Sequence, residues 1–458
     1  MSDYDPLINS GSHTALIKAM EKARRGEDLC VAFIGGSITE GYSSTSHDKC
    51  YAKLIHEWWV ENFPGSSISY LNAGIGGTGS DFGSARVERD VLSHAPDVVF
   101  VDFTVNDASN EFFFETYEGL LRQILQSASH PAVVLLHFVQ YDSGISAQEW
   151  HLKLGKHYGL PCISCVDSIY RKLKDGVIEA SLFTQDMLHP NDTGHKMIAD
   201  MVTAFLSEVA GEPYEEVPDA AVPTSLSLNA WEKAKCLQNK DHDAVLKGFV
   251  KDTKEKEYPS DHFRGGWSGT KAGDEIIFRL NCSEISVQIR RTVKRPAPVA
   301  AAVIDGDEEN AVLLDANFDQ DWGDCLAVIP VMRHGCILSG QTKEAFSPAR
   351  YENSAAVLEK YKDNVPKAKE HELRIRILGT PDELGFETGE LISGGPAWHK
   401  SEGDNALPAF DAFVMHGSVV EVDGGAYAFS AESGTGKTTH TRYWKEVLKD
   451  RVTVINGD

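Results

Sequence analysis

The stretch that decides the fold is Val31-Ala32-Phe33-Ile34-Gly35-Gly36-Ser37-Ile38-Thr39. Its first four residues are apolar, and a short apolar run bounded by glycines predicts a strand buried on both faces of a parallel sheet. The two glycines that follow predict a sharp turn. Ser37 is therefore expected at the carboxyl edge of the sheet, where open α/β folds place their functional groups.

Further apolar runs recur on both sides of this stretch. Helical periodicity covers residues 13–25, and a last helix is expected from Gly194 to about residue 209. Strand-like runs, separated by helical stretches, lie at 30–34, 68–72, 97–103, 132–138 and 161–166. This alternation predicts an α/β fold with a parallel sheet and helices on both of its faces.

A second stretch, Asp186-Met187-Leu188-His189-Pro190, supplies the groups that a serine needs for catalysis. A serine hydroxyl is a weak nucleophile at neutral pH unless an adjacent imidazole acts as its base. The imidazole needs a carboxylate that fixes its tautomer and stabilises its charged form. Because Asp-x-x-His places both helpers on one turn, the sequence predicts a catalytic triad of Ser37, His189 and Asp186.

Two blocks between these stretches contain groups that could stabilise an oxyanion. The first block, residues 72–79, is rich in glycine, and a glycine exposes its backbone N–H without a side chain in the way. The second block, residues 97–107, is a strand-like run that ends in Asn106, whose amide can donate a hydrogen bond. Together with the N–H of Ser37, these donors could surround a negative charge that develops on a carbonyl oxygen.

These four blocks resemble the SGNH (GDSL-type) hydrolase family. The resemblance implies that Ser37 is the nucleophile, that His189 is the general base and later the acid, and that Asp186 orients His189. It also implies that Gly77 and Asn106 are the oxyanion donors and that the parallel sheet is flavodoxin-like. For this chemistry it implies neither a cofactor nor a metal.

The resemblance covers roughly residues 28–210, and two departures from the family pattern stand out. The usual Gly-Asp-Ser opening is Gly35-Gly36-Ser37, so one hydrogen-bonding carboxylate is missing. The usual glycine before Asn-Asp is replaced by the Thr104-Val105 pair. Neither departure removes a catalytic group, but both affect substrate fit and loop geometry.

Composition narrows the classes of partner. The 458 residues are enough for two or three domains, and 42% hydrophobic with 24% charged residues is ordinary for globular proteins. A formal net charge of -24 disfavours nucleic acid and anionic membranes as partners, because both would be repelled. An acidic N-terminus without an apolar segment predicts a cytoplasmic protein with reduced thiols. Cys162 and Cys165 have redox or metal-ligand spacing, but buried packing is the favoured interpretation, since no second pair accompanies them.

The pattern changes after an acidic, proline-rich linker at 211–223. Short strand-like runs broken by Gly, Asp, Asn and Pro lie at 275–281, 284–291, 299–304, 311–314, 325–331 and 371–378. They predict an antiparallel β-sandwich of the jelly-roll kind over 213–395, following a hydrolase domain over 1–212. This part resembles the β-sandwich modules attached to some SGNH carbohydrate esterases. Trp267 and Trp322 are interpreted either as core residues, which is favoured, or as faces that stack on sugar rings.

A third motif lies near the end of the chain, in residues 431–438, and matches a phosphate-binding loop between a strand-like and a helical run. Residues 407–458 resemble the start of a P-loop kinase domain of the HPr kinase type, which implies ATP with Mg²⁺ as ligand. The sequence ends at Asp458, before the rest of a nucleotide-binding sheet and the site for a phosphate acceptor. We therefore expect 396–458 to be a truncated segment without kinase activity. The nucleotide-binding residues implied are Ser433, Gly434, Gly436, Lys437, Thr438 and Asp458.

Three functions follow from these patterns. The first is a serine esterase that deacetylates O-acetylated carbohydrates through an acyl-enzyme on Ser37, with an acetylated oligosaccharide or another small ester as substrate. The second is a nucleotide-binding or kinase-like protein that uses Lys437 and Thr438. The third is a sugar-binding module with a degenerate hydrolase, against which the intact serine, aspartate, histidine and asparagine argue. The sequence does not predict the acyl group, the sugar or the oligomeric state.

Overall fold

A computed structural model describes most of the chain, and it divides into two compact units, Met1–Glu232 and Lys233–Asp458. The residues that the structure describes are 4–216, 221–254, 263–318, 323–333, 335–338, 367–384, 413–415 and 419–421. None of the described helices is both long and apolar enough to cross a membrane.

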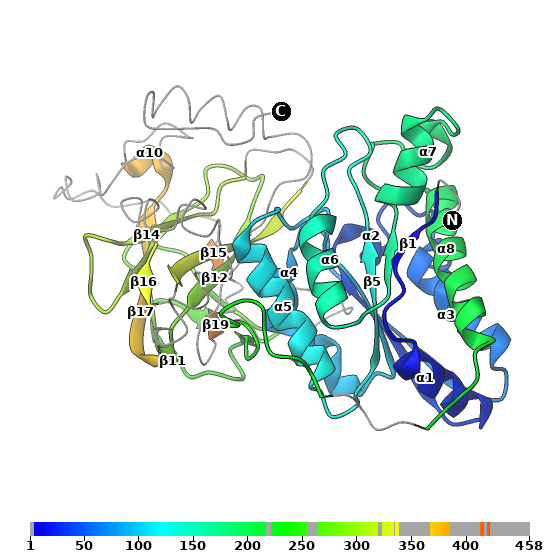
Figure 1. Cartoon of the computed structure of the whole chain (residues 1–458). Coiled ribbons are helices and arrows are strands. Elements are labelled where there is room, and N and C mark those ends of the chain that lie inside the picture. The colour runs from blue at the N-terminus through cyan, green and yellow to red at the C-terminus, as the bar shows by residue number, and fades with distance from the viewer. Residues whose placement is uncertain are drawn as a thin grey trace. The chain divides into compact units, whose positions relative to one another are not determined.

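The first unit is built on one sheet, of which β1 and β5 are labelled in Figure 1. Among the described residues the sheet has six strands, in the order β1-β6-β5-β4-β2-β3. All pairs are parallel except that of β1 with β6 at the edge. Without β1, this is the flavodoxin-like strand order. The strands are β1 (Leu7–Asn9), β2 (Leu29–Gly35), β3 (Ile68–Gly74), β4 (Val98–Asp102), β5 (Ala132–His137) and β6 (Cys162–Ser164).

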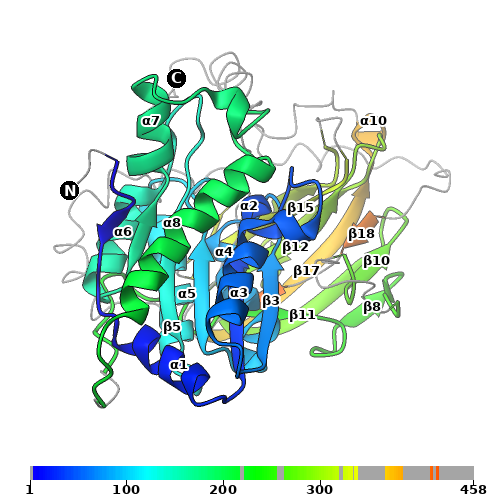
Figure 2. The ribbon, with the colours of Figure 1, turned by 90° about the vertical axis from the view of Figure 1, so that its right-hand side faces the viewer.

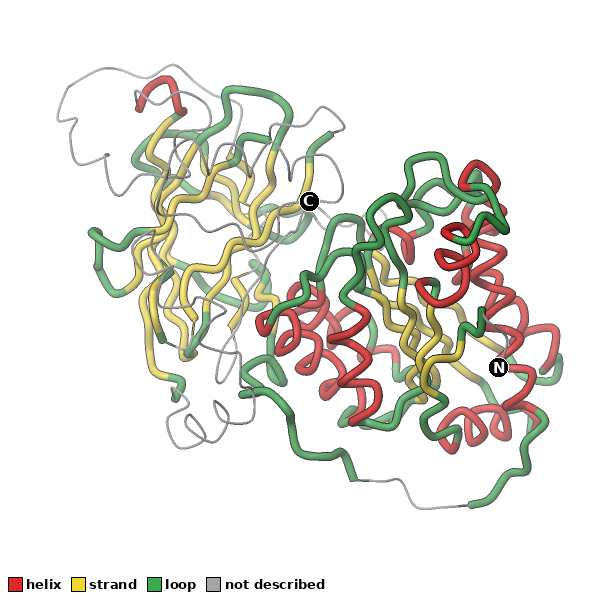
Figure 3. The backbone as a smooth tube through the Cα atoms, turned by 45° about the horizontal axis from the view of Figure 1, so that its top comes forward, coloured by secondary structure: helices red, strands yellow, loops and turns green. Residues whose placement is uncertain are grey.

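Helices cover both faces of this sheet, as the tube in Figure 3 shows. One apolar core lies under α1, α3 and α8, the face turned to the viewer in Figure 2, and a second lies under α4, α5 and α6. The helices are α1 (Thr14–Arg24), α2 (Ser37–Glu40), α3 (Tyr51–Asn62), α4 (Ser80–Asp90), α5 (Glu111–Leu125), α6 (Gln148–His157), α7 (Arg171–Lys174) and α8 (Asp192–Ala210). The predicted parallel α/β fold is confirmed.

The strand order creates a switch point at the carboxyl end of β2. The chain runs from β2 outward to β3 and then crosses to β4 on the other side of β2. The loop that follows β2 leads to α3 on one face of the sheet, whereas the loop that follows the neighbouring strand β4 leads to α5 on the other face. Such folds bind ligands at this switch point. Ser37 follows β2 directly, so the topology alone places it there.

The second unit consists of antiparallel sheets, as predicted. Two five-stranded sheets, counted over the described residues, have the orders β14-β13-β17-β11-β8 and β16-β15-β12-β19-β7. Side chains from both sheets form one apolar core, so the sheets pack face to face. The strands are β7 (Lys235–Leu237), β8 (Val245–Lys247), β9 (Val250–Lys251), β10 (Trp267–Gly269), β11 (Glu275–Cys282), β12 (Ile285–Arg291), β13 (Val299–Ile304), β14 (Val312–Asp315), β15 (Cys325–Arg333), β16 (Cys336–Ile337), β17 (Lys369–Gly379), β18 (Phe413–Met415) and β19 (Val419–Glu421), with the short helix α10 (Pro381–Leu384).

The division between the units lies later than the acidic linker predicts. The segment 221–232, here called the return segment, runs back along α5 and belongs to the first unit. Glu118 accepts the N–H groups of Leu226 and Ser227 at 2.6 and 2.7 Å, and Glu115 accepts the N–H of Ala230 at 3.0 Å. The boundary after residue 212 is thus replaced by one after residue 232.

Trp231 anchors the return segment. It is fully buried, and a Cβ on Gly119 would lie 2.4 Å from the Trp231 Cβ and 2.7 Å from its backbone carbonyl carbon. A residue larger than glycine at position 119 of α5 would therefore push the segment off the helix. Because the tryptophan ring also meets Phe112 edge-on, with 5.9 Å between centroids, it fills a slot on the helix surface.

The start of the predicted third domain also differs from the structure. Strands β18 and β19 come from the segment that the sequence assigns to a P-loop unit. In the structure β18 pairs with β10, and β19 lies between β12 and β7. The described parts of this segment therefore belong to the antiparallel sheets.

Candidate active site

Ser37 lies at the turn between β2 and α2, and glycine is required on its amino-terminal side. A Cβ on Gly35 would lie 2.6 Å from the carbonyl oxygen of Asp102 and 2.2 Å from the Thr39 hydroxyl, so no larger residue fits. Gly41 ends α2 in the left-handed conformation, with φ of 101°. The short helix presents Ser37 at its first turn, at the carboxyl edge of the sheet.

The structure brings Ser37, His189 and Asp186 into one hydrogen-bonded chain. Ser37 Oγ lies 2.8 Å from His189 Nε2, and His189 Nδ1 lies 2.6 Å from Asp186 Oδ2. With Nδ1 donating to the carboxylate, Nε2 is left as the acceptor for the serine proton. This is the arrangement that activates a serine hydroxyl.

The turn that carries Asp186 and His189 is stabilised by its own backbone. Asp186 Oδ1 accepts the N–H groups of Leu188 and His189 at 3.0 and 2.7 Å. Met187 has a positive φ of 64°, and its carbonyl accepts the N–H of Tyr141 at 2.7 Å. Partial burial opposes ionisation of Asp186, but hydrogen bonds from the His189 ring and from both amides outweigh it and hold the pKa of this carboxyl well below its usual range. Asp186 is therefore a carboxylate at neutral pH.

The two expected oxyanion donors follow the neighbouring strands. Gly77 lies in the loop after β3 with φ of 69°, a conformation that favours glycine. Asn106 lies after β4 and is 5% exposed, and its Oδ1 has no hydrogen-bond partner among the described residues. Its side chain lies against Gly36, because a Cβ there would be 2.3 Å from Oδ1. The structure thus places the Asn106 amide directly beside the residue that precedes Ser37.

Comparisons with known proteins agree with this geometry. Residues 33–197 match the model of the GDSL-like lipase/acylhydrolase family. A crystallised two-domain esterase (CEX) active on acetylated mannans is 38% identical, with a TM-score of 0.75, over 92% of this chain and 98% of that one. The chain belongs to the GDSL-like lipase/acylhydrolase family. It is accordingly a serine hydrolase that acts on carboxylic esters.

Two further similarities are informative. The same two-domain esterase co-crystallised with mannopentaose matches with 38% identity and a TM-score of 0.74, covering 92% of this chain and 97% of that one. Thioesterase 1/protease 1/lysophospholipase L1 of Escherichia coli (strain K12) is 27% identical over 183 residues, which are 38% of this chain and 81% of that protein. The match to the two-domain esterase is long enough to include both units. The match to the thioesterase covers 183 residues, which is less than the length of the first unit.

The two departures from the family pattern have structural reasons. At Gly36 the space for a side chain is occupied by the Asn106 amide. At Thr104 the hydroxyl accepts the N–H of Phe138 at 2.7 Å and donates to its carbonyl at 3.1 Å. Thr104 thus ties the end of β4 to the end of β5, which fixes the loop that carries Asn106.

Two residues that position the site, Arg86 and Glu40, are not indicated by any sequence pattern. Arg86 of α4 is fully buried and donates to the carbonyl oxygens of Ala73 and Gly35, at 2.7 and 3.2 Å. It therefore holds the carboxyl ends of β3 and β2 together, close to the nucleophile. Glu40, three residues after Ser37, accepts the N–H of Gly76 at 2.8 Å and so links α2 to the glycine loop. Only the folded chain shows either contact.

Buried carboxyl groups lie beneath the site. Burial raises the pKa of Asp102 to about 8 and that of Asp107 to about 8. Asp107 accepts the N–H of Ser80 at 2.8 Å and lies 3.1 Å from Nε2 of His151, whose pKa burial lowers to about 3. Burial favours the neutral form of both groups. The contact with Ser80 joins α4 to the loop of Asn106, and the contact with His151 joins α6 to it. Asp102 receives a hydrogen bond from Thr39 at 3.3 Å.

Two further groups of candidate ligand residues are the cysteine pair Cys162 and Cys165 and the phosphate-loop set. Cys162 and Cys165 are both buried and unpaired, which confirms the packing interpretation. Among the residues that the structure describes, no group of three or more His, Cys, Asp or Glu side chains could hold a metal ion. The whole phosphate-loop set, which includes Lys437 and Thr438, lies outside the described residues.

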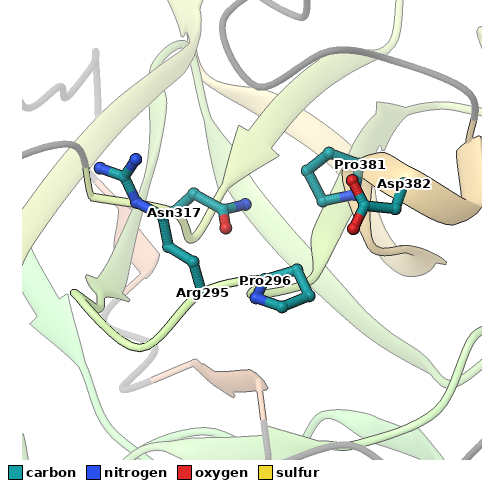
Figure 4. Close-up of a pocket in the computed structure, with 5 residues that line it drawn as sticks. All are labelled: Arg295, Pro296, Asn317, Pro381 and Asp382. Atoms are coloured by element: carbon teal, nitrogen blue, oxygen red, sulfur yellow. The ribbon is translucent and has the colours of Figure 1, made fainter.

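The second unit contains a small pocket of about 180 Å³, shown in Figure 4. Two of its polar side chains already have backbone partners: Arg295 Nε donates to the carbonyl of Phe318 at 2.7 Å, and Asn317 bonds both backbone groups of Ala297. Trp267 is fully buried against Phe278, so it is a core residue rather than a sugar platform, and Trp322 lies outside the described residues. The pocket is lined by Arg295, Pro296, Asn317, Pro381 and Asp382.

Proposed function

We propose that this protein removes acetyl groups from O-acetylated mannan-type oligosaccharides through an acyl-enzyme on Ser37. The observation that carries the proposal is the likeness to the two-domain esterase active on acetylated mannans, which extends over 98% of that chain. A likeness that spans both units supports a shared substrate class better than a match to the catalytic unit alone.

In the acylation step, Ser37 Oγ attacks the acetyl carbonyl carbon while its proton passes to His189 Nε2. The carbonyl oxygen becomes an oxyanion, and the N–H groups of Ser37 and Gly77 and the Asn106 amide donate to it. His189 then gives the proton to the sugar oxygen as the C–O bond breaks. The sugar leaves with a free hydroxyl, and the acetyl group remains on Ser37.

In the deacylation step, water replaces the sugar. His189 takes one proton from the water as the water oxygen attacks the acetyl carbon, and it returns that proton to Ser37 Oγ as the C–Oγ bond breaks. The product leaves as acetic acid, which gives its remaining proton to solvent and becomes acetate. Asp186 remains ionised throughout and stabilises the imidazolium that forms in each step. The enzyme returns to its starting protonation state, and no cofactor takes part.

The test is acetate release from O-acetylated mannooligosaccharides, followed by NMR with the purified full chain and compared with acetylated xylooligosaccharides and with 4-nitrophenyl esters of increasing chain length. We expect the highest kcat/KM on the mannooligosaccharides and no release by the Ser37→Ala variant. Faster hydrolysis of long-chain esters than of any acetylated sugar would contradict the proposal.

Two expectations from sequence remain proposals. A cytoplasmic location is supported by the acidic composition, and cell fractionation would test it. ATP and Mg²⁺ binding at the phosphate loop is supported by the motif around Lys437 and Thr438 alone. Calorimetry on the full chain and on Lys437→Ala would test it, and no heat of binding in the unsubstituted chain would contradict it.

A further inference from the structure

Tyr42 is an exposed aromatic residue beside the catalytic base. It directly follows Gly41 at the end of α2, and it is 58% exposed although its ring packs against the ring of His189. The two ring centroids are 4.5 Å apart, and the planes are tilted by 55°. Part of the tyrosine ring therefore covers His189, and the rest is open to solvent.

The backbone of Tyr42 is held on both sides. Its N–H donates to the carbonyl of Ser37 at 2.9 Å, and its own carbonyl lies 3.3 Å from Nε2 of His195. Nδ1 of the same histidine accepts the N–H of Tyr51 at 3.3 Å. His195 is fully buried, so Tyr42 is tied to the nucleophile on one side and to the protein core on the other.

The loop that continues from Tyr42 is clamped to the first residue of α8. The backbone N–H and the hydroxyl of Thr45 each donate to the Asp192 carboxylate at 2.8 Å. Lys49 Nζ donates to the same carboxylate at 2.6 Å. Since α8 follows the Asp186–His189 turn directly, the clamp fixes the position of this loop relative to the catalytic base. The ring of Tyr42 is thus positioned before any substrate binds, which lowers the cost of binding.

The chemistry of ester cleavage says which part of a substrate such a ring would meet. His189 Nε2 must give its proton to the leaving oxygen, so the alcohol portion of the ester lies on the His189 side of the scissile bond. In a hexopyranose acetylated at O2, O3 or O4 that oxygen is bonded directly to a ring carbon. The sugar ring therefore lies one bond from the atom that His189 touches, next to whatever flanks His189.

We infer that Tyr42 is a specificity-determining residue that packs against the sugar ring from which the acetyl group is removed. This rests on the proposed function and adds the part of the site that selects the alcohol. A tyrosine ring suits the task because its face packs on the apolar C–H face of a sugar while its hydroxyl stays available to polar partners. The acyl group lies on the other side of the scissile bond and does not contact Tyr42.

The experiment compares two acetyl esters that differ only in the alcohol, an O-acetylated mannooligosaccharide and ethyl acetate. For Tyr42→Ala we expect kcat/KM on the sugar ester to fall about tenfold or more, equivalent to about 1.4 kcal/mol, with less than about a twofold change on ethyl acetate. Tyr42→Phe keeps the ring and should stay near the unsubstituted enzyme on both. Tyr214→Ala removes another exposed tyrosine, 41% exposed, and should change neither value.

Each contrary outcome has a distinct meaning. Equal losses on both esters, with a shifted acid limb in the pH profile, would show that Tyr42 acts only by positioning His189 and would overturn the inference. Loss that grows with acyl length along nitrophenyl acetate, butyrate and octanoate would place the ring against the acyl group and overturn it too. An unaffected Tyr42→Ala with an active enzyme refutes the inference alone. Ethyl acetate cleavage without acetate release from any acetylated sugar refutes the proposed function as well.

Discussion

Replacing Gly36 by alanine should damage catalysis although no catalytic residue is substituted. A Cβ at this position would lie 2.3 Å from Oδ1 and 3.1 Å from Cγ of Asn106. Ordinary contact begins near 3.4 Å, so the Asn106 amide has to move by about 1 Å. Gly36 has a negative φ of -87°, so alanine at this position does not require the left-handed conformation.

The size of the effect follows from what the amide does. Loss of one oxyanion donor typically costs about 10²–10³ in kcat, or about 2.7–4 kcal/mol. A donor displaced by about 1 Å loses much of this contribution, since misplacement of that size can cost about 10²-fold. For Gly36→Ala we expect kcat to fall about 100-fold with KM changed less than about twofold, because the oxyanion exists only in the transition state.

The assay is steady-state hydrolysis of 4-nitrophenyl acetate, with circular dichroism to confirm folding. Gly65→Ala is the matched control, because a Cβ at Gly65 has no neighbour within 4 Å. The double variant Gly36→Ala/Asn106→Ala should be no slower than Asn106→Ala alone, since both changes remove the same interaction. A Gly36→Ala enzyme with normal kcat, or fully additive losses in the double variant, would refute the reasoning.

Further predictions concern the triad, a buried acid and the return segment. Ser37→Ala should lower kcat by several orders of magnitude while the melting curve is unchanged, and more than about a tenth of the activity would remove Ser37 from its role. His189→Ala should lower kcat as much as Ser37→Ala does, and Asp186→Ala should lower it less, as measured from about pH 6 to 9. Equal rates in all variants would contradict the assignment of a catalytic triad. Asp102 has its pKa raised to about 8, so its stabilising contribution is present below its unfolded pKa near 4 and is lost as pH rises toward 8. Asp102→Asn should therefore show a flatter decline of Tm between about pH 5 and 8, and parallel curves would disprove this. Trp231→Ala should lower the free energy of unfolding by about 3–5 kcal/mol in urea titrations; a change below about 1 kcal/mol would contradict its anchoring role.

The strands that are buried on both faces were predictable because burial leaves a continuous apolar run. Residues 30–34 and 97–103 correspond to β2 and β4 within two residues at each end. By contrast, β1 spans three residues at the sheet edge, and a run this short has no periodicity to read. Strands β7 to β10 of the second unit have two or three residues each, so they also lack a periodicity that could predict them.

The catalytic groups were predictable where their partners are close in sequence. Asp186 and His189 share one turn, so their spacing alone indicates the contact. The roles of Arg86, Glu40 and Tyr42 depend on contacts between separate elements, and no local pattern signals them. Each of these residues would pass as an ordinary surface or helix residue until the fold places it beside Ser37.

The return segment decides where this hydrolase can be cut from one protein and joined to another. The last helix of the parallel fold, α8, ends at Ala210, and a genetic fusion guided by the catalytic motifs would break the chain there. Such a cut would strip the backbone partners from the buried carboxylates Glu115 and Glu118 and empty the slot that Trp231 fills on α5. The portable module therefore extends to Glu232, and a fusion that keeps the hydrolase stable should join its partner after that residue.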